Sequence, residues 1–209
     1  MKGIVDLYPF ESLSKDNILI KKFSVNKQEA RSFNLGQLFS GRSIMQIQPG
    51  QYVQLYVDGK IMMSDTPFEL TTNSEFVAFA HGDVMIAGLG LGVIIYNLKE
   101  KVLNGEITSI TVYEKNQAVI DVVLPLFKDF PIKCICKDIL TYKPPKEEKY
   151  DTMYFDIWPT IDYEINLPEI RMLHNRWKSH KKTKDSWMNS WMKEFMQAER
   201  IKDRREGYI

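Results

Sequence analysis

The feature that most constrains the fold is the alternating run Gly-Leu-Gly-Leu-Gly at residues 88–92. It follows residues 84–87, which are apolar enough for a short buried strand. It precedes residues 93–102, whose apolar side chains recur at helical spacing. Glycine accepts the positive backbone angles of a tight turn and allows another group to approach the chain closely. Because the turn also leads into a helix N-terminus with free N–H groups, the sequence predicts a ligand-binding turn here.

Short strands and helices alternate around this turn. We expect further strands at residues 107–113, 132–136 and 151–155, and helices at residues 93–102 and 116–124. Such alternation predicts a parallel sheet with right-handed crossovers, and therefore an α/β fold with a Rossmann-like parallel sheet. In this architecture a ligand binds beyond the carboxyl ends of the strands, where the strand order reverses.

The N-terminal part of the chain has a different pattern. We expect a strand at residues 17–25 and a helix at residues 27–39 that Gly41 ends. A hairpin over residues 51–64 follows, because an Asp-Gly pair separates two segments of strand character. Residues 1–74 are therefore expected to form a unit consisting of a helix and an antiparallel hairpin region.

The strand pattern stops near residue 160. We expect residues 75–160 to form the Rossmann-like core, and residues 161–209 to form a helical extension with helices at 167–181 and 185–205. This leaves a reduced sheet of four strands, unless a fifth strand is hidden near residues 187–195. A reduced sheet exposes an edge, which a second copy of the chain could cover in a homodimer.

Composition and charge exclude several kinds of protein. The net charge is +1, with 44% hydrophobic and 26% charged residues, so no overall field attracts nucleic acid or a membrane. Cys134 and Cys136 lack the second ligand pair of a zinc site, and the three histidines have no ligand spacing, so we expect no metal. No apolar stretch approaches the roughly 20 residues that span a bilayer, and residues 1–10 lack the apolar core of a secretory signal. We expect a cytoplasmic protein.

The partner we expect is a small-molecule substrate. The basic run at residues 176–184 leaves nucleic acid as an alternative.

The spacing of Gly88, Gly90 and Gly92 resembles the glycine loop of class I S-adenosylmethionine-dependent methyltransferases and of their relatives, the spermidine synthases. In those families the loop passes beside the ribose and the amino-acid tail of the ligand. The resemblance implies S-adenosylmethionine as the cofactor, or decarboxylated S-adenosylmethionine for a protein of the spermidine synthase type. The implied cofactor-binding residues are Gly88, Leu89, Gly90, Gly92, Glu114, Lys115, Asp138, Ile139 and Asp156.

Acidic residues follow the second and third strands of the predicted core. Glu114 ends the second strand, where a carboxylate can accept hydrogen bonds from both ribose hydroxyls. The resemblance implies that Asp138 accepts from the adenine amino group and that Ile139 packs on the ring. The alternatives are a solvated carboxylate for Glu114 and a purely structural loop for Asp138 and Ile139.

Candidates for catalysis and acceptor binding lie in two other segments. Asp156 follows the fourth strand, where a carboxylate could take a proton from an attacking amine or orient it; the alternative is a helix cap. Trp158 could exclude water from the pocket or bind a cation on its ring face. Asp65 and Thr66 precede the core, and we expect both to contact the substrate, with Asp65 also a catalytic candidate.

Five short segments resemble uncharacterised methyltransferase-like proteins of phages and bacteria. They are residues 63–67, 88–92, 156–159, 166–170 and 186–191. This resemblance implies a methyltransferase with an unidentified acceptor. One alternative is an aminopropyltransferase of the spermidine synthase type, although two aspartates usual in that family are replaced here by Gly90 and Pro159. Another is a non-catalytic binder of S-adenosylmethionine-type nucleosides.

Overall fold

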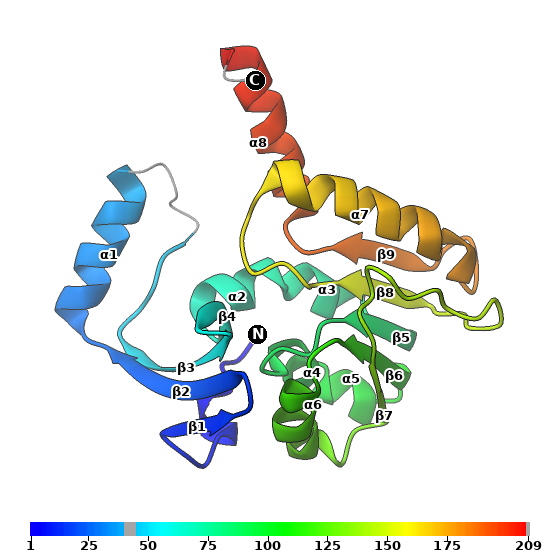
Figure 1. Ribbon diagram of the computed structural model, residues 1–209, viewed down its shortest axis with the longest axis horizontal. Helices are drawn as coiled ribbons and strands as arrows, with labels where there is room; N and C mark the ends of the chain where they lie inside the picture. Colours follow the sequence, from blue (N-terminus) through cyan, green and yellow to red (C-terminus); the bar gives the residue numbers. More distant parts are fainter. Residues whose placement is uncertain (40–44, 208–209) are drawn as a thin grey trace.

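The computed structural model describes residues 1–39 and 45–207 and contains two β-sheets (Figure 1). The N-terminal sheet is antiparallel, in the order β1-β2-β3-β4. Its strands are β1 (Ser12–Lys15), β2 (Ile18–Val25), β3 (Gly50–Val57) and β4 (Lys60–Ser64). The expected helix and antiparallel region are confirmed, whereas Gly41, the expected end of the helix, lies outside the described residues.

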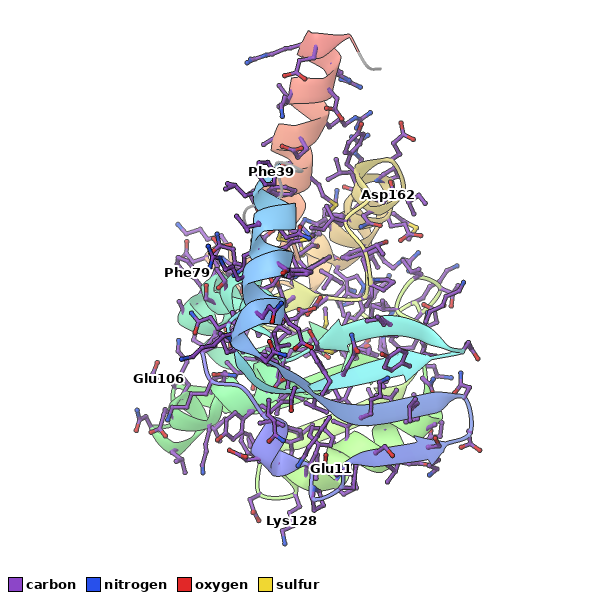
Figure 2. All side chains as sticks on the ribbon, turned by 90° about the vertical axis from the view of Figure 1, so that its left-hand side faces the viewer. Glu11, Phe39, Phe79, Glu106, Lys128 and Asp162 are labelled. Carbon is purple, nitrogen blue, oxygen red and sulfur yellow. The ribbon has the colours of Figure 1, made fainter. Side chains whose placement is uncertain are left out.

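Local interactions explain why α1 (Lys27–Phe39) begins where it does. The Asn26 side chain accepts hydrogen bonds from the N–H groups of Gln28 and Glu29 at 2.9 and 3.0 Å, and the Glu29 carboxylate accepts from the Asn26 N–H at 2.8 Å. This reciprocal pair is a capping box. Figure 2 shows α1 extending from the N-terminal sheet, with Phe39 at its far end.

The second sheet is entirely parallel and has the strand order β7-β6-β5-β8-β9. Its strands are β5 (Gly82–Ala87), β6 (Ile107–Glu114), β7 (Ile132–Cys136), β8 (Thr152–Phe155) and β9 (Trp187–Ser190). The chain builds β5, β6 and β7 in one direction and then returns to place β8 on the other side of β5. The strand order therefore reverses between β5 and β8. This is a Rossmann-like α/β fold, as the sequence predicts.

Strand β9 corrects two expectations. Residues 185–205 were expected to be one helix, and the sheet was expected to have four strands. Instead, Trp187–Ser190 pairs with β8 in parallel register, and α8 (Lys193–Glu206) begins only afterwards. Because the strand has only four residues, it is too short to show the alternating pattern of a strand, and the four-residue spacing of Trp187 and Trp191 suggests a helix instead. The parallel sheet thus extends beyond residue 160, the expected limit of the core.

Helices cover both faces of the parallel sheet (Figure 1). One face carries α4 (Val93–Asn97), α5 (Lys99–Leu103) and α6 (Gln117–Val123), and the other carries α7 (Tyr163–Trp177), against which α8 packs. Before β5 lie α2 (Pro67–Thr72) and α3 (Ser74–Phe79). Short 3-10 turns occur at Val5–Leu7, Leu124–Phe127 and Lys178–His180. None of the helices in residues 1–39 and 45–207 combines the length and apolar character needed to cross a bilayer.

Two helix boundaries differ from expectation. The helix expected at residues 93–102 is interrupted at Leu98, between α4 and α5. Helix α7 begins at Tyr163 and not at Leu167, because the Asp162 carboxylate accepts hydrogen bonds from the N–H groups of Glu164 and Ile165 and caps the first turn.

The N-terminal segment joins the two sheets. The buried Asp65 carboxylate accepts hydrogen bonds from the N–H groups of Ile4 and Val5 at 2.8 and 3.0 Å, and from that of Val53 at 2.7 Å. The buried Tyr8 hydroxyl donates to the carbonyl oxygen of Leu91 at 2.8 Å, in the turn after β5. These contacts hold the β3–β4 hairpin beside that turn.

We predict that Asp65→Ala lowers the free energy of unfolding by about 2–4 kcal/mol, because three backbone donors lose a charged acceptor inside the protein. Urea denaturation followed by tryptophan fluorescence measures this. Asp6→Ala is the matched control, since Asp6 lies in the same segment and is exposed. Equal stability of the two variants would contradict the structural role of Asp65.

Candidate functional site

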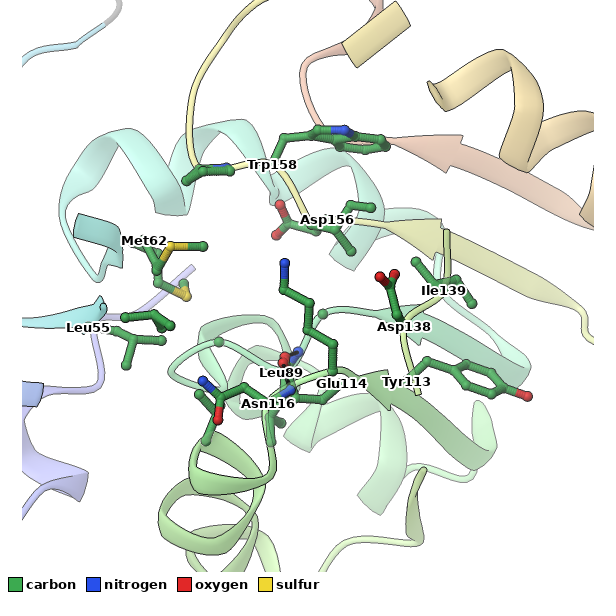
Figure 3. Close-up of a pocket in the computed structure, with 18 of the residues that line it drawn as sticks. Leu55, Met62, Leu89, Tyr113, Glu114, Asn116, Asp138, Ile139, Asp156 and Trp158 are labelled. Atoms are coloured by element: carbon green, nitrogen blue, oxygen red, sulfur yellow. Dashed lines mark hydrogen bonds between the residues drawn. The ribbon is translucent and has the colours of Figure 1, made fainter. Parts of the chain in front are cut away.

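A pocket of about 690 Å³ lies at the carboxyl ends of the parallel strands, where the strand order reverses. Figure 3 shows its walls. Leu89 and Glu114 lie on one side, Asp138 and Ile139 on a second, and Asp156 with Trp158 on a third. Leu55 and Met62 of the β3–β4 hairpin close the remaining side, so the N-terminal sheet completes the pocket. The volume suits a drug-sized ligand.

The three glycines of the turn after β5 all have positive φ, at 98° for Gly88, 50° for Gly90 and 77° for Gly92. L-amino acids that carry a side chain rarely adopt these angles. A Cβ on Gly88 would collide with the carbonyl oxygen of Asp156. One on Gly92 would collide with the ring of Phe127, on the side of α6, so Gly92 packs against the helical layer and does not line the pocket.

Gly90 lies under the thioether of Met63, which a Cβ at residue 90 would meet. The N–H of Leu91 donates to the Met63 sulfur at 3.1 Å. The hairpin therefore covers one side of the turn, while Gly88, Leu89 and Gly90 still line the pocket on the other side. The glycines are needed for close packing of protein groups as well as for the shape of the turn.

Glu114 links the end of β6 to the glycine turn. One carboxylate oxygen accepts a hydrogen bond from the Leu89 N–H at 2.9 Å, and the other accepts from the Asn116 N–H at 2.8 Å. Each carboxylate oxygen has capacity for a further donor. Glu114 and Lys115 both line the pocket, so the structure places these two expected residues beside the glycine turn.

The loop after β7 is shaped by hydrogen bonds of its own. The Asp138 carboxylate accepts from the Leu140 N–H at 2.9 Å through one oxygen, and the Ile139 side chain is buried where it lines the pocket. The Arg176 guanidinium, from α7, donates to the carbonyl oxygens of Ile139, Leu140 and Tyr142 at 3.0, 2.7 and 3.1 Å. Arg176, noted in the sequence only as part of a basic run, thus positions this wall.

Asp156 faces a second carboxylate that the sequence did not indicate. Asp156 lies on the pocket wall after β8, and Glu69 reaches the same wall from the first turn of α2. Burial raises the pKa of Asp156 to about 7, and a hydrogen bond from Asn73 lowers it in part. Burial, followed by repulsion from Asp156, raises the pKa of Glu69 well above its usual value. Asp156 does not cap a helix, since residues 156–161 are irregular.

Tryptophans enclose the same end of the pocket. The Trp158 indole N–H donates to the Glu169 carboxylate at 2.7 Å, and the Trp191 indole N–H donates to the Thr72 hydroxyl at 3.0 Å. Both side chains are buried where they line the pocket. Glu169 belongs to the segment at residues 166–170 noted in the sequence, so its resemblance could have indicated a role for it.

The pocket thus brings together most of the expected site residues. Those that line it are Gly88, Leu89, Gly90, Glu114, Lys115, Asp138, Ile139, Asp156 and Trp158. Three do not line it, and their expected contacts with a ligand are corrected. Gly92 packs on Phe127, Asp65 binds backbone N–H groups, and the Thr66 hydroxyl hydrogen-bonds that of Ser64 at 3.0 Å. The roles in binding and catalysis of the residues that do line it stay predictions.

Across residues 1–39 and 45–207, no three His, Cys, Asp or Glu side chains converge closely enough to hold a metal ion.

No model of a known protein family matches the chain, and no curated protein matches its sequence. Several of the solved structures that resemble it are S-adenosylmethionine-dependent methyltransferases, and others include a putative zinc-dependent alcohol dehydrogenase and a [4+2]-cyclase. One methyltransferase, from Leishmania major, is 15% identical, with a TM-score of 0.45 over 58% of this chain and 48% of the other. Another, from Clostridium acetobutylicum, is 17% identical, with a TM-score of 0.36 over 55% and 44%.

A third structure is coclaurine N-methyltransferase bound to N-methylheliamine and S-adenosylhomocysteine. It is 16% identical, with a TM-score of 0.44 over 65% of this chain and 37% of the other. The matched region spans less than half of each of these three proteins. The resemblance to spermidine synthases and to phage proteins stays a prediction, and the function is argued from the residues of the pocket.

We predict that Gly88→Ala destabilises the protein by about 2 kcal/mol or more, because the added Cβ meets the Asp156 carbonyl at a φ of 98°. Thermal unfolding measures this. Gly36→Ala is the matched control: nothing lies within 4 Å of its Cβ, and alanine favours a helix interior by about 0.5–1 kcal/mol. If Gly88→Ala unfolds at the same temperature as the wild type, the close approach of Gly88 to the Asp156 carbonyl is wrong.

Proposed function

We propose that the protein is an S-adenosylmethionine-dependent methyltransferase that binds its cofactor in the pocket at the strand ends. The observation that supports this most strongly is the junction of the glycine turn with Glu114. A carboxylate at the end of β6 lies against a glycine-rich turn at the reversal of strand order. That is the place where ligands bind in open α/β sheets.

The donor and acceptor groups of the pocket fit this cofactor. Glu114 retains acceptor capacity on both oxygens, which suits a pair of ribose hydroxyls. One carboxylate oxygen of Asp138 accepts a hydrogen bond from the Leu140 N–H, and the other oxygen can accept one from an exocyclic amino group. Ile139 and Leu89 supply apolar walls for a flat base. We assign Glu114 to the ribose and Asp138 with Ile139 to the adenine.

S-adenosylmethionine supplies a methyl group already activated by a sulfonium centre, so the protein needs no metal and no nucleophile of its own. Its residues have to orient the acceptor, exclude water and handle a proton. Trp158 and Trp191 enclose the end of the pocket where Asp156 and Glu69 lie. We assign Asp156 as the group that orients the acceptor and takes its proton.

Aminopropyl transfer is a second candidate, and one observation favours it. The sequence argued against it because Gly90 and Pro159 stand where spermidine synthases usually carry aspartates. The pocket nevertheless contains carboxylates from two other elements, Glu69 on α2 and Glu169 on α7. The product separates the two reactions: methyl transfer leaves S-adenosylhomocysteine, whereas aminopropyl transfer leaves methylthioadenosine. Binding without either product would support a non-catalytic nucleoside binder.

We predict that Glu114→Gln weakens binding of S-adenosylhomocysteine by at least about tenfold, because a charged acceptor is lost at the ribose. Isothermal titration calorimetry measures the dissociation constant. Glu100→Gln, on the exposed surface of α5, is the matched control and should bind like the wild type. Wild-type affinity in Glu114→Gln would show that the nucleoside binds elsewhere.

We also predict that Asp156→Asn stabilises the free protein at pH 8. Because the pKa of Asp156 in the folded protein, about 7, exceeds the usual value of 3.8, ionising Asp156 costs stability as the pH rises from about 4 to about 7. Thermal unfolding at pH 8 should show a gain of about 1 kcal/mol or more, and a smaller gain at pH 5. Asp129→Asn, at an exposed site, should show neither. If Asp156→Asn loses stability at pH 8, ionising Asp156 does not cost the folded protein stability and this prediction is wrong.

A further inference from the structure

The charges that line the pocket are unbalanced. Six carboxylates face three ammonium groups: Asp58, Glu69, Glu114, Asp138, Asp156 and Glu169 against Lys60, Lys115 and Lys137. The end formed by Glu69, Asp156 and Glu169 carries the excess. Among the ion pairs of the described residues, none involves any of these three side chains.

Glu69 and Asp156 form a pair of partly buried carboxyl groups, and the polar groups next to them are neutral. The Asn73 amide donates to the Glu69 backbone carbonyl at 3.2 Å and to its carboxylate at 3.4 Å, and its own oxygen accepts from the Tyr154 hydroxyl at 2.8 Å. Asn73 is completely buried, so this network is fixed. It leaves both carboxylates on the pocket wall, with the Asp156 carboxylate pointing into the pocket in Figure 3.

The tryptophans at this end add a second feature that attracts a cation. The indole N–H groups of Trp158 and Trp191 are used by Glu169 and Thr72, which fixes the rings at the pocket wall. Aromatic faces attract alkylammonium groups, and more strongly when water is excluded. Carboxylates and aromatic rings together are therefore matched to a positively charged guest and mismatched to a neutral or anionic one.

Resting on the function proposed above, we propose that the acceptor is a small alkylamine, bound as its ammonium ion by Glu69, Asp156 and Glu169, and that the Glu69–Asp156 pair takes its proton. This assigns the substrate class, and it gives Glu69, on the N-terminal side of the core, a direct role in binding.

The proton and electron balance of this step is simple. The ammonium ion first gives one proton to the carboxylate pair, which frees the nitrogen lone pair. The nitrogen then bonds to the methyl carbon while the carbon–sulfur bond breaks and its electron pair stays on sulfur. The product leaves as a methylated ammonium ion, and the carboxylate pair releases its proton to water. Carboxyl groups whose pKa values are raised in this way, to about 7 for Asp156, suit this exchange.

Several charged groups act on this pair, and a pH test has to consider all of them. On β8 itself lies Tyr154, whose pKa burial raises well above its usual value, with Asp156 as the next cause. The others that line the pocket are Glu169 on α7, Glu114 and Lys115 after β6, Lys137 and Asp138 after β7, and Asp58 and Lys60 in the hairpin.

Calorimetry with butylamine as the probe tests the proposal. The protein is first saturated with S-adenosylhomocysteine at pH 7 and then titrated with butylammonium chloride, or with butanol as the neutral control of equal length. We expect the ammonium ion to bind and butanol not to bind. Repeating the titration in buffers of different ionisation enthalpy should reveal proton release on binding, because a cation favours the charged carboxylates.

Glu69→Gln and Asp156→Asn should each weaken butylammonium binding by about tenfold or more and abolish the proton release. Far-UV circular dichroism of both variants should match that of the wild type, which shows that they are folded, and Glu69→Gln should also keep the wild-type affinity for S-adenosylhomocysteine. Glu75→Gln, on the neighbouring helix α3 and exposed, is the matched control and should behave as wild type.

The outcomes separate the two proposals. If S-adenosylhomocysteine does not bind, the proposed function is wrong. If it binds but butylammonium binds no better than butanol, the cationic acceptor is wrong while the cofactor site stands. If butylammonium binds equally well to Glu69→Gln and Asp156→Asn, the ammonium ion is bound elsewhere and the assignment of this pair fails.

Discussion

The close approach of Gly88 to the backbone carbonyl of Asp156 is the contact on which the pocket depends. Strands β5 and β8 are neighbours in register, and their carboxyl ends meet at this point. A side chain at residue 88 would separate the two ends, and the turn after β5 would no longer lie beside Asp156. The first role of the glycine turn is therefore to let the ends of β5 and β8 pack closely together. Its effect on a ligand follows from the geometry, because the chain that bends away from Asp156 exposes Leu89 and Gly90 to the pocket beside Glu114.

The N-terminal sheet determines how much of that pocket is open to water. Met63 lies over Gly90, the Tyr8 hydroxyl binds the Leu91 carbonyl, and Asp65 ties the first residues to β3. With Leu55 and Met62 on the pocket wall, the hairpin is part of the site and not a separate module. The short helix that follows the hairpin, α2, carries Glu69 to the pocket wall. The parallel sheet thus supplies the proposed nucleoside contacts, and the N-terminal part supplies one of the three proposed acceptor contacts.

Sequence reasoning recovers what is periodic or locally encoded. The β-α-β alternation, the helix at residues 27–39 and the glycine turn are all predictable because neighbouring residues decide them. Strand β9 is not, since four residues around Trp187 become a strand only by pairing with β8. In the site, Glu114 and Asp156 could be found by their position after strands, whereas Asp65 was misassigned. An acidic residue in a conspicuous motif can bind backbone N–H groups as readily as a substrate, and the sequence does not show that the first residues of the chain return to it. Glu69 was missed because tertiary packing alone brings it to the pocket, and Arg176 was missed because packing alone brings it to the loop after β7.

The carboxyl groups of Glu69 and Asp156 indicate that the acceptor end of the pocket favours ligand binding at the expense of stability. Burial makes both acids costly to ionise, and Asp156 adds to the cost for Glu69, so the pair destabilises the folded protein at neutral pH. A glutamine at residue 69 could keep the hydrogen bond to Asn73 without that cost. By contrast, Asp65 accepts hydrogen bonds from three backbone donors, which offset part of the cost of burying its charge, although burial still raises its pKa. Glu69 and Asp156 form no ion pair with a described cation. Under the proposal made above, an ammonium ligand supplies the positive charge at this end of the pocket, so the same feature that weakens the free protein selects that acceptor.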